Sequence, residues 1–158
     1  MQLITLIKRM SGGSKGVMNL NIKLLDKNCL PYKKYATDAG VDLKARIPKL
    51  VSISQFSTVA IPTGVCIDIP TGHFGLCTPR SSMNKLGVSS EVGTVDEGYT
   101  GELIVCVTNK TSTPYHIQPY DRIAQLIIIP CANVTNLIEV GEIPNKERGN
   151  NGYGSTGK

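Results

Sequence analysis

Several residue types are scarce in this 158-residue sequence, and each scarcity narrows the class of protein. There is no tryptophan and there are only two phenylalanines, so the sequence lacks the aromatic side chains, interleaved with basic residues, that nucleic-acid-binding modules carry. The net charge of +5 is the balance of 17 lysines and arginines against 12 aspartates and glutamates, and the basic residues form no dense run. We expect no nucleic-acid partner and favour a small anionic ligand instead.

No apolar stretch at the N-terminus is long enough to cross a membrane. The first ten residues, MQLITLIKRM, contain too few apolar residues for a membrane span and have no small-residue cleavage pattern of a secretory signal. SGGSKG follows at once. We therefore expect residues 1–18 to be a loose extension and the protein to need no membrane.

Cysteine spacing also excludes some chemistry. The five cysteines are odd in number, no C-x-x-C occurs, and the two histidines are far apart, so a closed zinc site has little support. We predict buried free thiols in a reducing intracellular compartment, the cytoplasm or nucleus. The cysteines are Cys29, Cys66, Cys77, Cys106 and Cys131.

Isoleucine, valine and leucine supply most of the apolar residues, alongside 16 glycines and nine prolines, and no long amphipathic helix is apparent. This pattern predicts an all-β domain of sandwich, jelly-roll or barrel type over residues 19–140, with a linker-like C-terminal segment at 141–158. We predict a bend at residues 62–64, a turn at 70–72 and a short helix within 81–87. Strands are expected at 20–24, 51–54, 57–69, 73–79, 102–109 and 122–130.

Two polar stretches interrupt the strand pattern in the first half of the chain. ATDAGVDL at 36–43 carries Asp38 and Asp42, which either form Asx turns or place Asp42 against a cation or sugar. In TPRSSMNK at 78–85 a serine would cap the short helix. Alternatively, Arg80 with two hydroxyls and the amides at a helix start would bind an anion.

Two further polar stretches, later in the chain, have either a structural or a ligand-binding role. GTVDEGYTGE at 93–102 has the look of a β-hairpin with Asp96 and Tyr99 at its tip. They are either a turn aspartate with a packing tyrosine, or a general base beside a phosphate with a platform for a ring. Gln125 interrupts an apolar run that Arg122 begins. A buried amide needs partners, so we expect Gln125 to reach a ligand, a backbone group or a strand end.

The tail GNNGYGSTGK at 149–158 contains the spacing G-x-x-x-x-G-K of a P-loop. A P-loop also requires a preceding strand and a Ser or Thr after its lysine, and NKERGNN before the glycines is not strand-like. Two interpretations therefore remain. The tail wraps an anion by its glycines, hydroxyls and the nearby Arg148, or it is a loose end.

Taken together and in order, these stretches resemble the five motifs of the trimeric dUTPase family over residues 20–157. The resemblance implies a distorted jelly roll, or β-clip, that forms a homotrimer with a flexible C-terminal tail. Three positions depart from the family pattern: Tyr120 stands where glycine usually precedes Asp-Arg, Asn151 replaces a small residue, and Tyr153 replaces phenylalanine. The matching segments are ATDAGVDL, PRSS, GTVDEGYTGE, DRIAQL and RGNNGYGSTG.

The resemblance implies hydrolysis of dUTP to dUMP and pyrophosphate by water attacking the α-phosphorus, which keeps uracil out of DNA and supplies dUMP for thymidylate synthesis. Asp96 would be the base that activates this water. Mg²⁺ would be held mainly by triphosphate oxygens, with Asp42 contacting its shell indirectly through water. The α- and β-phosphate ligands would be Arg80, Ser81, Ser82 and Gln125.

The resemblance also implies how the nucleoside is recognised. Main-chain groups of the third motif, including Gly93 and Val95, would read uracil, while Tyr99 under the deoxyribose would exclude a 2′-hydroxyl. In the tail, Tyr153 would stack on uracil. Arg148 and the loop of Gly154, Ser155 and Thr156 would close on the β- and γ-phosphates.

In the family three chains share each site. One gives the first, second and fourth motifs, another gives the third, and the last lends its tail. Two other functions remain open on the same fold. A dCTP deaminase would need a glutamate at the cytosine amino group, for which Glu91 is the only nearby candidate. A non-catalytic nucleotide-binding module would have no need of Asp96.

Overall fold

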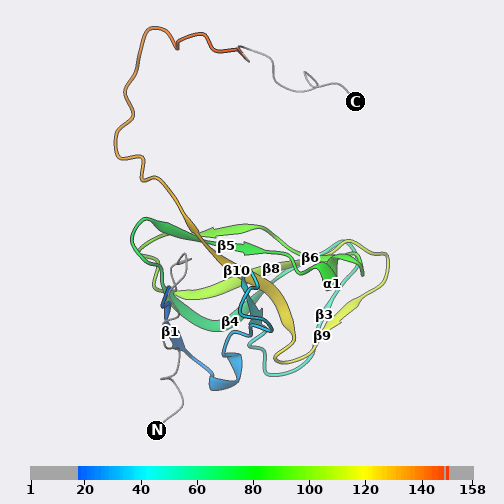
Figure 1. The fold of residues 1–158 in the computed structure, drawn as a ribbon. Helices are drawn as coiled ribbons and strands as arrows, with labels where there is room; N and C mark the ends of the chain where they lie inside the picture. The colour runs from blue at the N-terminus through cyan, green and yellow to red at the C-terminus, as the bar shows by residue number, and fades with distance from the viewer. Residues whose placement is uncertain (1–17, 148, 150–158) are drawn as a thin grey trace.

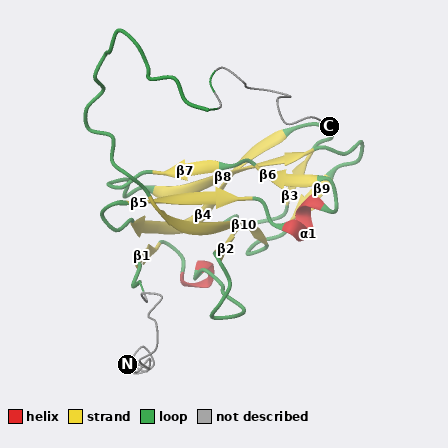
Figure 2. Cartoon of the chain, turned by 45° about the horizontal axis from the view of Figure 1, so that its top comes forward, coloured by secondary structure: helices red, strands yellow, loops and turns green. Residues whose placement is uncertain are grey.

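The structure is a computed structural model that describes residues 18–147 and 149. Two four-stranded antiparallel sheets lie face to face (Figures 1 and 2). One sheet has the order β1 (Asn21–Leu24), β4 (Thr58–Asp68), β8 (Glu102–Asn109), β6 (Val88–Ser90). The other has the order β2 (Val41–Lys44), β10 (Arg122–Pro130), β5 (His73–Thr78), β7 (Gly93–Val95). A third pair, β3 (Val51–Ile53) and β9 (Tyr115–Ile117), lies beside the helix α1 (Ser81–Asn84), and a 3-10 turn η1 (Lys27–Cys29) follows β1.

The core is formed by buried apolar side chains that alternate with exposed ones along the strands. In β8, Leu103, Val105 and Val107 are almost fully buried, whereas Ile104 and Cys106 between them are exposed. Successive side chains of a strand point to opposite faces, so this period places one row between the sheets. The prediction of an all-β domain of jelly-roll type is confirmed.

All six predicted strands form, with boundaries within a residue or two of those expected. The turn at residues 70–72 is also present: His73 N–H donates to the Pro70 carbonyl at 3.1 Å, and Gly72 has φ +73°. The predicted helix is shorter than expected, ending at Asn84. Four short strands were not predicted: β2, β6, β7 and β9.

Residues 62–64 bend β4 without ending it. The register between β4 and β8 shifts between Pro62 and Cys66, and Gly64 in this bulge has φ +71°, a conformation that glycine adopts without a steric penalty. Thr63 is fully buried there, and its hydroxyl donates to the Leu103 carbonyl at 2.9 Å. The bulge therefore replaces part of the backbone ladder by side-chain contacts.

Beyond β10 the chain forms an extended arm that leaves the body of the molecule (Figure 1). We define the arm as residues 131–147, which are exposed throughout. Several apolar side chains lie along it, and Leu137 is 92% exposed. They are Val134, Leu137, Ile138, Val140 and Ile143.

All five cysteines are free, as expected, but the prediction that they are buried is wrong for three of them. Cys29 and Cys77 are buried, Cys66 is partly exposed, and Cys106 and Cys131 are exposed. Burial raises the pKa of the Cys77 thiol. Among the described residues, no helix has the length and hydropathy needed to span a membrane.

Candidate functional site

A row of polar side chains crosses the outer face of the β2–β10–β5 sheet. Gln125 of β10 is the register partner of Asp42 on β2 and of Thr78 on β5. Residues directly opposite one another on antiparallel strands point to the same face. Their chain neighbours Leu43 and Leu126 are buried in the core, so the polar row faces away from it.

Asp42 holds two arginines at one end of this row. Arg80 Nε donates to Asp42 Oδ1 and Arg122 Nη1 donates to Asp42 Oδ2, both at 3.1 Å. Arg80 Nη1 also donates to the Arg122 carbonyl at 2.8 Å, and the Arg122 guanidinium lies 4.9 Å from the centre of the Tyr32 ring. Asp42 therefore orients Arg80 directly, a role that the sequence did not predict.

Arg80 occupies the N-cap position of α1, and Ser81 and Ser82 are its first two residues. The interpretation of these serines as helix caps is wrong, since the cap residue is Arg80 and it makes no side-chain capping bond. Both serine side chains are exposed. A hollow of about 240 Å³ adjoins them, lined among others by Arg80, Ser82, Tyr115, Asp121 and Arg122.

Gln125 is satisfied by the backbone, one of the three outcomes expected for it. Its Nε2 donates to the Pro79 carbonyl at 3.1 Å, which fixes the residue before Arg80. The Thr78 hydroxyl is buried and has no hydrogen-bond partner in the described part of the chain. Thr78 was not predicted as a site residue, although it lies two residues before Arg80. We call Asp42, Arg80, Ser81, Ser82 and Gln125 the first half-site.

The third motif forms a turn between the two sheets. Tyr99 N–H donates to the Asp96 carbonyl at 3.1 Å, and Gly98 has φ +90°. Both Asp96 and Tyr99 are exposed, and Tyr99 Oη donates to the Glu102 carbonyl at 2.9 Å. We call Gly93, Val95, Asp96 and Tyr99 the second half-site.

The prediction of a β-hairpin at this motif is wrong. β7 pairs with β5 and β8 pairs with β4 and β6, so the turn connects two sheets rather than two paired strands. β7 is the edge of its sheet, and β6 covers only the Val107–Asn109 end of β8. No described strand pairs with the edge of β8 that faces β7 at residues 103–105.

A slot of about 160 Å³ lies between these two edges. Gly93, Thr94 and Val95 of β7 line one side, and Leu103 to Cys106 of β8 line the other. The Val95 side chain is 9% exposed, so any ligand contact by Val95 would come from its main chain. Glu91 also lines the slot, and the Thr108 hydroxyl donates to its Oε1 at 2.6 Å.

The two half-sites lie at opposite ends of β5. Val95, next to Asp96, pairs with Gly75 near the start of β5, whereas Arg80 follows its end. At ~3.3 Å per residue, Asp96 and Arg80 are roughly 15–20 Å apart along the sheet. The neighbouring Glu97 confirms the location, because its Oε2 accepts the Gly72 N–H at 2.9 Å in the turn before β5. One chain does not bring both half-sites to one phosphorus atom.

Tyr120, at the departure from the family pattern, has φ +67°. Such a conformation costs a non-glycine residue ~1–2 kcal/mol, which explains why glycine suits the position. Tyr120 Oη donates to Asp26 Oδ2 at 2.9 Å, and this bond helps to lower the pKa of Asp26, after the larger effect of the Asn28 amide. The tyrosine hydroxyl thus ties this strained residue to the N-cap of η1.

No group of three or more histidine, cysteine, aspartate or glutamate side chains among the described residues is arranged to hold a metal. In the first half-site, both Asp42 oxygens already accept bonds from guanidinium groups. This donor set fits an indirect contact with a hard cation whose other ligands come from elsewhere. Arg148, Tyr153, Gly154, Ser155 and Thr156 lie outside the described residues, as does Asn151.

Comparison with known proteins identifies the family. The family model for dUTPase matches residues 26–157. Deoxyuridine 5′-triphosphate nucleotidohydrolases from Burkholderia thailandensis and Paraburkholderia phymatum are each 37% identical over 148 residues, which cover 89% of this chain and 99% of each relative.

Solved structures agree with the family match. A Staphylococcus bacteriophage 80alpha dUTPase with dUPNHPP has a TM-score of 0.81 and 30% identity, over 90% of this chain and all of that chain. A mutant dUTPase from phage phi11 of S. aureus, described as revealing coordination of a structural Mg(II) ion, has a TM-score of 0.72 and 27% identity. That match covers 80% of this chain and 99% of the phage enzyme.

Proposed function

This chain belongs to the dUTPase family, and we propose that its two half-sites, supplied by neighbouring chains, hydrolyse dUTP to dUMP and pyrophosphate. The dUTP diphosphatase activity follows from the family match and the named relatives. The observation that supports the site assignment is the division itself. Clustered arginine and serine side chains lie at one end of β5, and Asp96 lies beside a slot at the other.

The separation of the half-sites supports a homotrimer with shared sites. A base that activates water must lie within hydrogen-bond reach of it, and the water must be in line with the phosphorus. The roughly 15–20 Å between Asp96 and Arg80 in one chain exceeds that reach severalfold. A neighbouring copy that presents its first half-site to the Asp96 of this chain closes the gap.

The exposed arm provides a second argument for association. Five apolar residues along residues 131–147 are 52–92% exposed in the described part of the chain. Apolar surface of this kind on an extended segment is stabilised by packing against a partner. In this proposal a second copy of this chain is the partner, and the tail that follows the arm closes a neighbour's site.

The chemistry requires a base and positive charge. Asp96 orients a water molecule and accepts its proton while the water oxygen bonds to the α-phosphorus. The bond between that phosphorus and the bridging oxygen breaks, and pyrophosphate leaves. Negative charge accumulates on the phosphate oxygens, so Arg80, the hydroxyls of Ser81 and Ser82 and the second N–H of Gln125 stabilise the α- and β-phosphates.

A magnesium ion fits this donor set as a cation that arrives with the triphosphate. When bound, it supplies charge neutralisation to the phosphate oxygens. Asp42 is the residue that would contact its water shell, while it holds Arg80 and Arg122 by direct ion pairs. The protein's own contribution at Asp42 is therefore the orientation of Arg80.

The slot between β7 and β8 suits a pyrimidine. Backbone N–H and C=O groups on the facing strand edges are available to pair with the polar edge of uracil. Tyr99, 46% exposed in the turn that joins β7 to β8, lies under the deoxyribose and leaves no room for a 2′-hydroxyl. Tyr153 of a tail would then cover the base, with Arg148, Gly154, Ser155 and Thr156 closing on the phosphates as a lid.

Separation of the products from dUTP, dCTP and UTP tests this function. We expect dUMP and pyrophosphate from dUTP, and little turnover of the other two nucleotides. Conversion of dCTP to dUTP would instead indicate a deaminase that uses Glu91, and binding without any product would indicate a non-catalytic module. Either result would overturn the proposal.

A further inference from the structure

The Arg46–Glu102 pair is not part of either half-site and was not predicted from the sequence. Arg46 Nε donates to Glu102 Oε1 at 2.8 Å and Arg46 Nη2 donates to Oε2 at 2.7 Å, so the pair is bidentate. The Glu102 side chain is 17% exposed and the Arg46 side chain is 38% exposed. The guanidinium, with help from a backbone amide at Gly64, holds the pKa of Glu102 below its ordinary value.

The bulge in β4 is built around this carboxylate. The Gly64 N–H donates to Glu102 Oε1 at 2.7 Å, at the place where β4 leaves its register with β8. A Cβ atom added to Gly64 would come within 2.9 Å of Arg46 Cδ, so a side chain there would displace the arginine. Glu102 is thus fixed by three hydrogen bonds from two separate segments.

The backbone of the same residue holds Tyr99. Tyr99 Oη donates to the Glu102 carbonyl at 2.9 Å. The tyrosine ring lies over Gly101, where an added Cβ would come 2.6 Å from the hydroxyl oxygen. The position of the Tyr99 ring therefore depends on where Glu102 is held.

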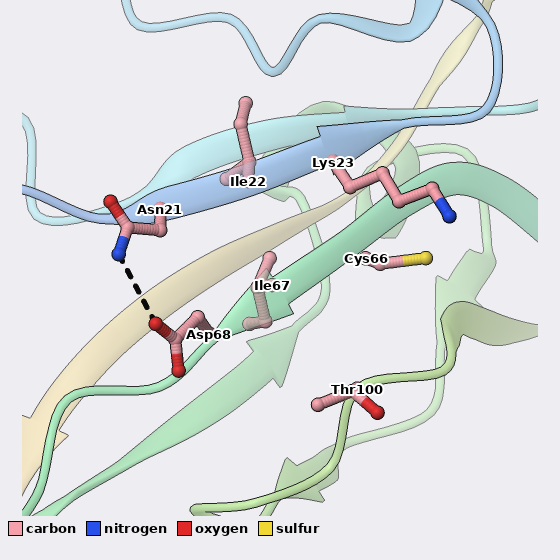
Figure 3. Close-up of a pocket in the computed structure, with 7 residues that line it drawn as sticks. All are labelled: Asn21, Ile22, Lys23, Cys66, Ile67, Asp68 and Thr100. Carbon is pink, nitrogen blue, oxygen red and sulfur yellow. Dashed lines mark hydrogen bonds between the residues drawn. The ribbon is translucent and has the colours of Figure 1, made fainter.

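On the side of Thr100, the turn between β7 and β8 borders a hollow. Thr100, next to Tyr99, lines a hollow of about 290 Å³ together with residues of β1 and β4 (Figure 3). Figure 3 shows Thr100 across this hollow from Ile22 and Ile67. The Glu97 carboxylate ties the start of the turn to Gly72, but the bond from the Tyr99 hydroxyl goes to Glu102, so the anchor of the ring itself is the end at Glu102.

We propose that the Arg46–Glu102 pair positions Tyr99 and thereby sets how strongly the enzyme rejects a nucleotide with a 2′-hydroxyl. This inference rests on the proposed function, in which Tyr99 lies under the deoxyribose. Steric rejection of one hydroxyl requires the ring to be held to within about an ångström, and a displacement of that size changes rates by one to two orders of magnitude. Arg46 and Glu102 are positioning residues, because neither lines the slot and both act through Tyr99.

The test measures the ratio of kcat/KM for dUTP to kcat/KM for UTP in Arg46→Met, Glu102→Gln and the double variant. We expect each single variant to lower the ratio about tenfold, and the double variant to lower it no further, since both changes break one contact. Arg46→Lys keeps the charge and one bond, so its ratio should be intermediate. Asp68→Asn, which removes an exposed carboxylate at the end of β4, outside the arm and both half-sites, is the charge-matched control and should keep the parent ratio.

A Tyr99→Ala variant separates the two levels of the argument. If this variant keeps the parent ratio, the sugar-facing role of Tyr99 is wrong and the proposed function must be revised. If Tyr99→Ala loses discrimination while Arg46→Met and Glu102→Gln stay within about twofold of the parent, the positioning inference is overturned. A purely structural pair would lower the melting temperature of Arg46→Lys and leave its ratio unchanged, which also contradicts the inference.

Discussion

Replacing Asp42 by asparagine tests whether this residue acts by orienting Arg80. Asparagine keeps the size of the side chain but removes its charge, so the two charge-assisted bonds from Arg80 and Arg122 are lost. The Asp42 and Arg80 side chains are each 19% exposed and the contacts are 3.1 Å long. For such partly screened bonds we use the lower end of the usual range, ~1.5 kcal/mol, which corresponds to about a tenfold fall in kcat.

The expected change separates kcat from KM. Arg80 retains its 2.8 Å bond to the Arg122 carbonyl, so the guanidinium stays near its place but loses its fixed angle. Removing a negative charge beside two arginines also makes the first half-site more attractive to phosphate. We therefore expect kcat to fall about tenfold and KM for dUTP to stay the same or decrease.

Steady-state kinetics over a range of magnesium concentrations provides the assay. Asp38→Asn is the matched control, because Asp38 lies in the loop just before β2 and accepts the Tyr35 N–H at 2.8 Å. An unchanged kcat in Asp42→Asn would refute the orienting role. A loss that disappears when magnesium is raised would show instead that Asp42 acts through the water shell of the ion.

Three further outcomes are expected. Asn109→Ala should lower the free energy of unfolding by ~2–4 kcal/mol in a denaturant titration. The reason is that the buried Asn109 Nδ2 donates to the carbonyls of Ile53 at 3.1 Å and Thr113 at 2.7 Å. A loss below ~0.5 kcal/mol would contradict this role. Because the pKa of Glu102 is lowered in the folded state, its carboxylate stabilises the fold above the ordinary value of 4.5, and this stabilisation is lost as pH falls through the folded-state pKa. The difference in melting temperature between the parent and Glu102→Gln should therefore shrink as pH falls below about 4.5. A difference that stays constant with pH would refute this linkage. Deleting residues 148–158 should leave the melting temperature unchanged and remove most dUTP hydrolysis; full activity of the shortened chain would refute the lid.

Long strands were predictable because their pattern is local. Leu103, Val105 and Val107 alternate with exposed residues over enough positions for the period of two to be read directly. β6, β7 and β9 have three residues each, which is too short for a period to emerge. The third motif has the turn signals of a hairpin, but turn residues do not determine which strand β7 pairs with.

Individual residues of the site could be predicted from the sequence, but the contacts between them could not. Asp96, Arg80 and Gln125 were singled out because polar residues stand where strands should be. The ion pairs of Asp42 with Arg80 and Arg122, and of Arg46 with Glu102, join residues that are distant in sequence. Such pairs depend on sheet register, which is a property of the folded chain and is not visible in any local stretch.

We propose that each site combines the first half-site of one chain with the Asp96 of another. An Arg80→Ala protein and an Asp96→Asn protein, each inactive alone, can be mixed in equal amounts and allowed to exchange subunits, with exchange verified by native mass spectrometry. Random exchange gives about one quarter of the sites both an intact Arg80 from one parent and an intact Asp96 from the other, so about one quarter of parent dUTP hydrolysis should return. Activity that stays at the sum of the two inactive proteins after complete exchange would contradict the shared site.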